Sequence, residues 1–188
     1  MRTESRPLET RRLVRLAAMG FSVLAPLVQA QSDGSFEDAF RKALAVPDSS
    51  VRLEALRQLQ DLVQTPDSIQ ETKPLVLDVS GLLSNDRNPI VRREAVRTLV
   101  AFQSSEARSA LHQALESPDS AVRYEAVTGL GNVGDQSSLP FLQARLDDRA
   151  PHVRRAALRA IQAIARDRRR RSQAPALPPP AHHSGAGA

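Results

Sequence analysis

The middle of the chain reads Asp119-Ser120-Ala121-Val122-Arg123-Tyr124-Glu125-Ala126-Val127, and this nine-residue pattern occurs four times in the sequence. The other copies cover residues 48–56, 88–96 and 150–158. Their Val-Arg pairs begin at residues 51, 91, 122 and 153, so successive copies are 40, 31 and 31 residues apart. A period of about 20 to 50 residues is typical of proteins that stack one supersecondary unit on the next.

Each copy predicts the start of an α-helix with one apolar face. A valine, an alanine, an aliphatic residue and a later leucine or isoleucine recur at positions i, i+4, i+5 and i+8, as in Val153, Ala157, Leu158 and Ile161. That spacing places them on one side of a helix. Three copies begin with a short polar side chain that can accept first-turn amide protons, whereas the fourth begins with Ala150. We therefore expect the fourth helix to start least cleanly.

A second apolar, helix-patterned stretch precedes each of these helices, at residues 36–44, 74–83, 106–115 and 139–146. Two antiparallel helices per period form a unit that buries its apolar faces only by stacking on its neighbours. The sequence thus predicts an all-α protein, an α-solenoid of about four antiparallel helix pairs. The extra residues of the first period fall mostly around residues 65–73 and indicate a longer loop.

Composition supports a helical core and excludes several kinds of site. Of the 188 residues 41% are hydrophobic but only 3% aromatic, so the core is built from Leu, Val, Ile and Ala. The absence of cysteine excludes disulfides, thiolate metal sites and thiol nucleophiles. The net charge of +5 comes from the ends, because residues 1–31 sum to +3, residues 166–188 to +4 and the body between them to −2. Since the body is not basic, we do not expect nucleic acid as a partner.

The N-terminus has the pattern of an export signal. Arg11, Arg12 and Arg15 precede an uncharged stretch over residues 16–32, and Val28 and Ala30 fit a cleavage after residue 30. We predict a signal peptide at residues 1–30, a short linker at 31–34 and an exported protein, periplasmic or secreted. An uncleaved anchor and a cytosolic amphipathic segment are the alternatives.

The last two repeats carry a specific resemblance to a known family. Gly129-Leu130-Gly131-Asn132-Val133-Gly134-Asp135 is followed by Leu139-Pro140-Phe141-Leu142 and then by Pro151-His152-Val153-Arg154-Arg155-Ala156-Ala157. These runs resemble HEAT-like repeats of the phycobilisome-lyase type, and looser matches extend the resemblance over about residues 35–166. The resemblance implies a right-handed α-solenoid whose second helices line a concave face, without implying one function. We place the array at residues 35–167.

An arginine follows the valine in every copy, giving a column of Arg52, Arg92, Arg123 and Arg154. In HEAT-like arrays such a column usually pairs with a turn acid of its own or the neighbouring repeat. Four aspartates stand in turns where they can pair with these arginines: Asp48, Asp86, Asp119 and Asp148. We expect this column to hold the stack together rather than to bind a ligand.

The candidate binding residues are those that vary between repeats. The positions two and six after the valine share a helix face, and on the presumed concave side they include Arg93, Arg97, Tyr124, Arg155 and Arg159. Arginine with tyrosine is a combination favoured at protein interfaces and suited to acidic partners. We predict that these five residues bind a protein partner; a merely solvated face is the alternative.

Catalysis has little support in the sequence. The four histidines, His112, His152, His182 and His183, stand in no metal-ligand spacing, and no serine lies in a nucleophile elbow. We therefore predict no enzyme, no metal and no cofactor. An accessory factor resembling the lyase-type HEAT proteins remains an alternative suggested by the resemblance.

The C-terminus changes character after the array. Arg168, Arg169, Arg170 and Arg171 lead into a segment rich in Pro and Ala, so we predict a disordered tail at residues 168–188. A basic cluster of this kind can contact an anionic membrane or polymer, and a helix end stabilised by cations is the alternative. Our main hypothesis is an exported, non-enzymatic scaffold that holds a protein partner on its concave face. An adaptor that docks through the basic tail is the second.

Overall fold

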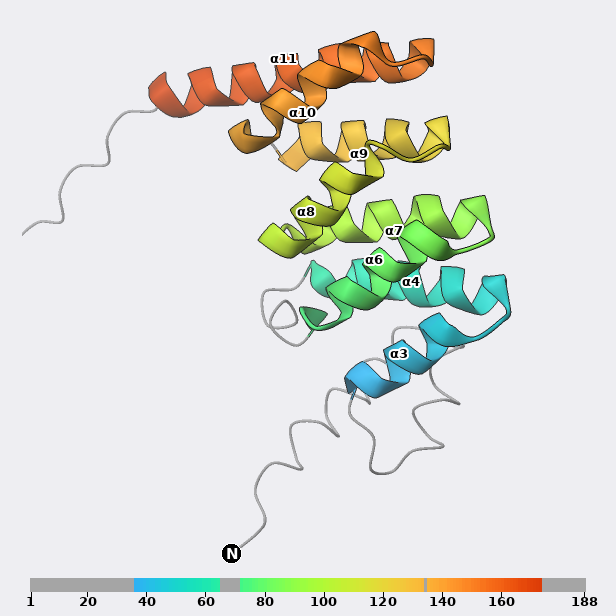
Figure 1. Cartoon of the computed structure of the whole chain (residues 1–188). Coiled ribbons are helices and arrows are strands. Elements are labelled where there is room, and N and C mark those ends of the chain that lie inside the picture. Colours follow the sequence, from blue (N-terminus) through green and yellow to red (C-terminus); the bar gives the residue numbers. More distant parts are fainter. Residues whose placement is uncertain (1–35, 65–71, 134, 174–188) are drawn as a thin grey trace, which may run out of the picture.

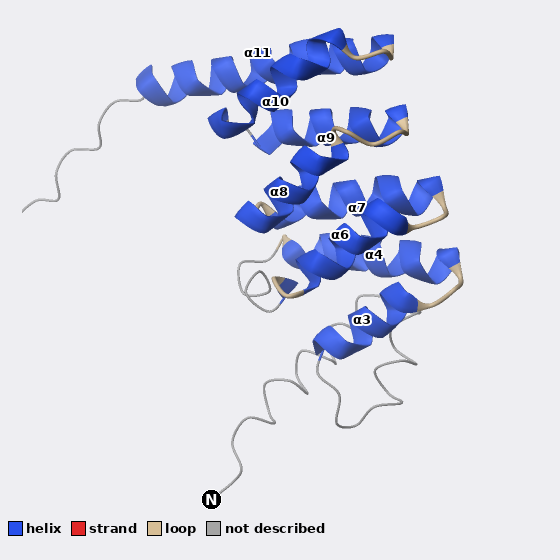
Figure 2. Cartoon of the chain, viewed as in Figure 1, coloured by secondary structure: helices blue, strands red, loops and turns tan. Residues whose placement is uncertain are grey.

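A computed structural model describes residues 36–64, 72–133 and 135–173, and within these ranges the chain is helical and has no strand (Figures 1 and 2). The helices are α3 (Phe36–Ala45), α4 (Ser49–Val63), α6 (Leu75–Asn85), α7 (Pro89–Phe102), α8 (Ser105–Ala114), α9 (Ser120–Val133), α10 (Leu139–Ala144) and α11 (Pro151–Gln173). Two 3₁₀ turns, Gln136–Ser138 and Arg145–Asp147, flank α10. Each helix predicted from the repeat is present.

The helices form two layers (Figure 1). The second helices of the pairs stack in the order α4, α7, α9 and α11, and the first helices α3, α6, α8 and α10 cross over them on one side. Each second helix packs on the next along the stack, as do α3 on α6 and α6 on α8. The described chain is therefore an α-solenoid of four helix pairs, as the sequence predicts.

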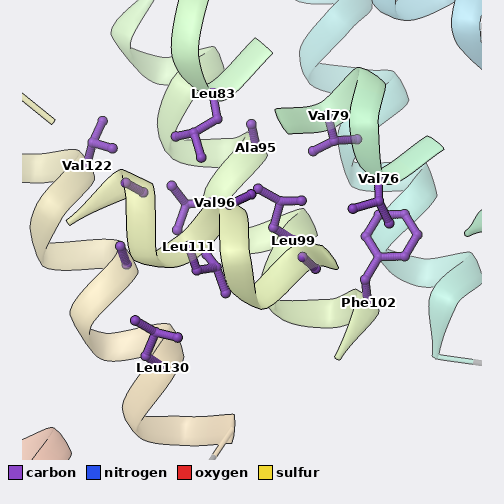
Figure 3. Close-up of a cluster of buried hydrophobic side chains, with 14 of the residues drawn as sticks. Val76, Val79, Leu83, Ala95, Val96, Leu99, Phe102, Leu111, Val122 and Leu130 are labelled. Carbon is purple, nitrogen blue, oxygen red and sulfur yellow. The ribbon is translucent and has the colours of Figure 1, made fainter. Parts of the chain in front are cut away.

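One continuous apolar core runs through the stack. The alanine four residues after each repeat valine is completely buried, at Ala55, Ala95, Ala126 and Ala157. Figure 3 shows side chains from neighbouring helices meeting in this core, among them Val79, Val96, Leu111 and Leu130. A small residue at the repeated position lets adjacent second helices approach closely, because no branched side chain stands between them.

The capping side chains occur where the sequence predicts them. Asp48 Oδ1 accepts the Ser50 amide at 2.8 Å, and Asn88 Oδ1 accepts the Ile90 amide at 2.9 Å. Ala150 has no such side chain, and Asp148 instead orders the turn by accepting the Ala150 amide at 2.8 Å. The last repeat begins without an N-cap side chain of its own.

The predicted boundary after residue 167 is not where the helix ends, because α11 continues to Gln173. Arg168, Arg169, Arg170 and Arg171 are therefore helical rather than part of a disordered tail. Arginine is a good helix former, cations are favourable in a last turn, and Asp167 pairs with Arg171 at 2.7 Å one turn on. The predicted signal peptide, the linker and residues 174–188 lie outside the described residues.

Candidate partner-binding face

The arginine column links each repeat to the next. Arg52 Nε donates to Asp86 Oδ2 at 2.7 Å, Arg92 Nη2 to Asp119 Oδ2 at 3.2 Å and Arg123 Nε to Asp148 Oδ2 at 2.8 Å. The Nη1 of every column arginine also donates to carbonyls of its own turn, such as Arg123 to Ser117 O at 2.8 Å. The structural role expected for the column is confirmed for Arg52, Arg92 and Arg123, each of which donates to an aspartate of the following repeat.

The deepest of these links joins Arg123 and Asp148, whose side chains are 4% and 3% exposed. The hydrogen bond from Arg123, together with the Ala150 amide, lowers the pKa of Asp148 to about 2. Both oxygens of Asp148 and all three guanidinium nitrogens of Arg123 have partners. This pair is a structural tie that is closed to any ligand.

The five predicted binding residues lie on three successive second helices: Arg93 and Arg97 on α7, Tyr124 on α9, and Arg155 and Arg159 on α11. Arg97 is engaged within the stack, because its Nη2 donates to Glu125 Oε1 at 2.6 Å and its Nη1 to Glu94 Oε2 at 3.4 Å. The bond to Glu125 raises the pKa of Arg97. Arg97 is thus mainly an inter-repeat tie, which its sequence position alone did not reveal.

The other four residues are differently placed. Arg155 and Arg159 are exposed, and neither pairs with a carboxylate in the described ranges. Arg93 is partly exposed and makes no ion pair there either. Tyr124 is half-buried against the core, and its ring centroid lies 5.8 Å from that of His152 at an angle of 54°. These helices therefore offer three guanidinium groups that pair with no described carboxylate, and one contact between two rings.

A polar network beneath this face was not predicted. Gln60 Nε2 donates from α4 to Glu94 Oε1 and to Thr98 Oγ1 of α7, both at 3.0 Å, and Thr98 donates to the Glu94 carbonyl. Glu94 and Thr98 are buried. The only sequence signal for it was the glutamate three residues after the valine in three of the copies.

One histidine contacts a serine, at His112 Nε2 and Ser138 Oγ, 2.9 Å apart. The Ser138 side chain is fully buried and His112 is stacked on Phe141, with ring centroids 3.9 Å apart. This contact joins α8 to the next pair and exposes no nucleophile. In the ranges that the structure describes, no three acidic or histidine side chains gather as a metal site.

The four arginines of the predicted tail cluster differ in their surroundings. Arg168 and Arg169 help to line a pocket of about 330 Å³ with Leu139, Ile164 and Ser172. Arg171 is paired with Asp167, and Arg170 is exposed. Among the described helices, none combines the length and the apolar content that a membrane-spanning segment needs.

The comparisons agree with this geometry. A family model described as HEAT repeats matches residues 78–162. Over this segment the chain is similar to HEAT repeats, in agreement with its stack of helix pairs. The column of inter-repeat arginines and the repeated buried alanines lie in and around the matched segment. HEAT repeats generally mediate interactions between proteins. The likeness to the phycobilisome-lyase type stays a prediction.

Solved structures share the fold. An engineered protein of the Northeast Structural Genomics Consortium aligns with a TM-score of 0.51 and 25% identity, over 68% of this chain and 62% of its own. A second engineered protein of the same consortium aligns with a TM-score of 0.51 and 22% identity, over 82% of this chain and 84% of its own. Cex1p aligns with a TM-score of 0.58 and 17% identity, over 94% of this chain but only 36% of Cex1p. No curated protein matches significantly.

Proposed function

We propose that this HEAT-like repeat protein is an exported, non-enzymatic scaffold that holds an acidic protein partner on the face of its second helices. The observation that carries the proposal is the pair Arg155 and Arg159, which are exposed on α11 and form no ion pair with a carboxylate of the described residues. By contrast, Arg52, Arg92, Arg97 and Arg123 at the junctions between repeats are each paired with a carboxylate of the next repeat. Free guanidinium groups on a rigid helix suit the carboxylates of a partner, which accept charge-assisted hydrogen bonds.

Tyr124 and His152 add an apolar, preorganised centre to this face. Their rings are held by α9 and α11, so a partner that packs on them orders few side chains on this protein. Interfaces commonly place an aromatic anchor at the centre with charged groups around it. Export rests on the charge and apolar pattern of residues 1–30 and stays a prediction.

The second candidate is an adaptor that docks an anionic membrane or polymer through Arg168–Arg171. The extension of α11 favours it, because these arginines project on a helix beyond the array and two of them line a pocket. Binding of this kind is electrostatic and falls steeply as salt rises, whereas a packed protein interface persists.

The experiment measures how charge changes on this protein alter its affinity for a partner captured from the cell envelope. Arg155→Glu and Arg159→Glu should each weaken binding by about tenfold, that is about 1 to 2 kcal/mol, with unchanged helicity. Lys42→Glu, an equal change of charge on the exposed surface of α3, should have little effect. Tyr124→Ala is less suitable because Tyr124 packs on the core. Loss confined to a variant with alanine at residues 168–171 would reject the second-helix face and support the adaptor.

A further inference from the structure

Each junction between second helices uses the same three positions of the earlier helix, one, five and nine residues after its repeat valine. We call these the forward positions. They are Arg52, Leu56 and Gln60 in α4, Arg92, Val96 and Val100 in α7, and Arg123, Val127 and Gly131 in α9. The arginine bonds an aspartate of the next repeat, as described above. The second position is 0% exposed in all three helices.

The third forward position meets the residue seven after the next valine. Gln60 donates to Thr98 at 3.0 Å. At the following junction a Cβ on Gly129 would overlap the side chain of Val100, and at the last one a Cβ on Gly131 would stand 2.6 Å from Ala160 Cβ. The three junctions therefore share this contact, whereas the aspartate that accepts from the arginine lies five residues before the valine at Asp86 and Asp148 and three before it at Asp119.

In α11 the forward positions are Arg154, Leu158 and Gln162, and they have nothing to pack on in the described part of the chain. Figure 1 shows α11 as the last layer of the stack. Leu158 is 51% exposed, whereas its three counterparts are fully buried. Arg154 donates to the carbonyls of Asp148 and Arg149 as its counterparts do in their turns, but it pairs with no described carboxylate. This end of the solenoid is an open stacking face.

The first repeat presents the groups that such a face requires. Asp48 corresponds to Asp119, which accepts from Arg92, yet Asp48 is exposed, and among the described residues its side chain accepts only from Ser50. Val51 is partly exposed, whereas the other three repeat valines are fully buried. These are the receiving positions of a junction that no described layer occupies.

Two further side chains of α4 stand where the acceptors of the glutamine at the third forward position stand in α7. Glu54 corresponds to Glu94, which accepts from Gln60. Gln58 corresponds to Thr98, and its amide oxygen is buried without any hydrogen-bond donor. Gln58 Nε2 donates to Glu54 Oε1 at 2.8 Å, and Glu54 Oε2 accepts no hydrogen bond from the described residues, so it can accept from an incoming glutamine.

We propose that the α11 end of one molecule stacks on the α4 end of a second copy, continuing the solenoid head to tail. Arg154 then bonds Asp48 of the second copy, Leu158 is covered beside Val51, and Gln162 donates to Glu54. The charges at the contact are opposite, because Arg154 is the charged residue among the forward positions of α11 and the receiving positions of the first repeat include Asp48 and Glu54. The two faces differ, so the contact is heterologous and adds one copy after another unless the stack closes.

The test blocks one face at a time in protein purified from its native host. Leu158→Arg blocks the α11 face and Asp48→Arg blocks the α4 face. Both substitutions introduce an arginine, so the two altered faces repel each other and cannot pair when the variants are mixed. In sedimentation velocity, the wild type should grow in mass with concentration and each variant alone should stay monomeric. An equal mixture should form a complex that stops at two chains, since only one junction in the mixture is intact.

Two controls separate the junction from general effects. Leu77→Arg, at an exposed leucine of α6, should self-associate like the wild type. Asp48→Asn keeps an N-cap acceptor but removes the charge, so it should weaken association without the helix-start cost of the arginine. A wild type that stays monomeric up to about 1 mM, or a mixture of the blocked variants that stays monomeric, would overturn the proposal.

Discussion

Arg123 uses all three of its guanidinium nitrogens at the junction between two repeats. Nε and Nη2 donate to the two oxygens of Asp148, each at 2.8 Å, and Nη1 donates to the Ser117 carbonyl. Burying two charges is costly, and a pair this deep is tolerated because the hydrogen bonds are all made. Removing one member would leave the other charge buried and unpaired. The same arginine at the exposed end of the array, Arg154, has no such constraint.

The first prediction concerns acid stability. Because the pKa of Asp148 is lowered from 3.8 to about 2, its contribution is fully present above about pH 4 and is lost as pH falls through 2. The shift corresponds to about 2 kcal/mol at most. In urea unfolding from pH 7 to pH 2, the stability difference between the wild type and Asp148→Asn should therefore shrink below pH 4. Asp61→Asn, at an exposed site, is the control. A difference that stays constant over this range would show that the ionised carboxylate is not what stabilises the junction.

At the scale of the element, glycine sets the distance between α9 and α11. Gly131 lies inside α9, and a Cβ there would stand 2.6 Å from Ala160 Cβ and 2.8 Å from Ala160 Cα. The second atom belongs to the backbone, so α11 itself would have to move. Gly81, in α6, has nothing within 4 Å of the same position. One glycine is required by packing and the other is not.

Two alanine substitutions test this difference. Gly131→Ala should lower the free energy of unfolding by about 1 to 3 kcal/mol because it overpacks the contact between α9 and α11. Gly81→Ala should raise it by about 0.5 to 1 kcal/mol, since glycine is a poor residue in a helix interior. Thermal unfolding followed by circular dichroism measures both. If Gly131→Ala proves as stable as Gly81→Ala, the close approach of α9 to α11 is wrong.

Much of the helix arrangement could be predicted from the repeat. The phase of the apolar face placed Ala126 and its counterparts in the core, and Asp48 and Asn88 marked helix starts. The extent of α11 could not be predicted, because an arginine run is compatible both with a helix and with a tail. The bond between Arg97 and Glu125 could not be predicted either, because it depends on how α7 and α9 are placed relative to each other. The five residues of the face were predicted to act together on a partner, whereas in the structure Arg97 is paired with Glu125 and Glu94.

At the scale of the whole molecule, charge and packing are distributed unevenly along the described stack. Its interior junctions are closed by Arg-Asp ties and buried side chains, while uncompensated arginines gather on α11. An array built from nearest-neighbour contacts is rigid within each junction and leaves its last layer free to meet another surface. The proposed partner binding uses Arg155 and Arg159, and the proposed self-stacking uses Arg154 and Leu158 on the adjacent side of the same helix.

The most direct measurement of the central claim is site-specific photo-cross-linking in the native host. A photoreactive amino acid at Thr128, which lies on α9 between the helices that carry Arg97 and Arg159, should give an adduct with one protein through an acidic segment of it. The same group at Leu77, on α6, should not give this adduct. Combining Arg155→Glu with Arg159→Glu should abolish it. An adduct that survives both charge reversals, or that forms equally from Leu77, would contradict binding on the second-helix face.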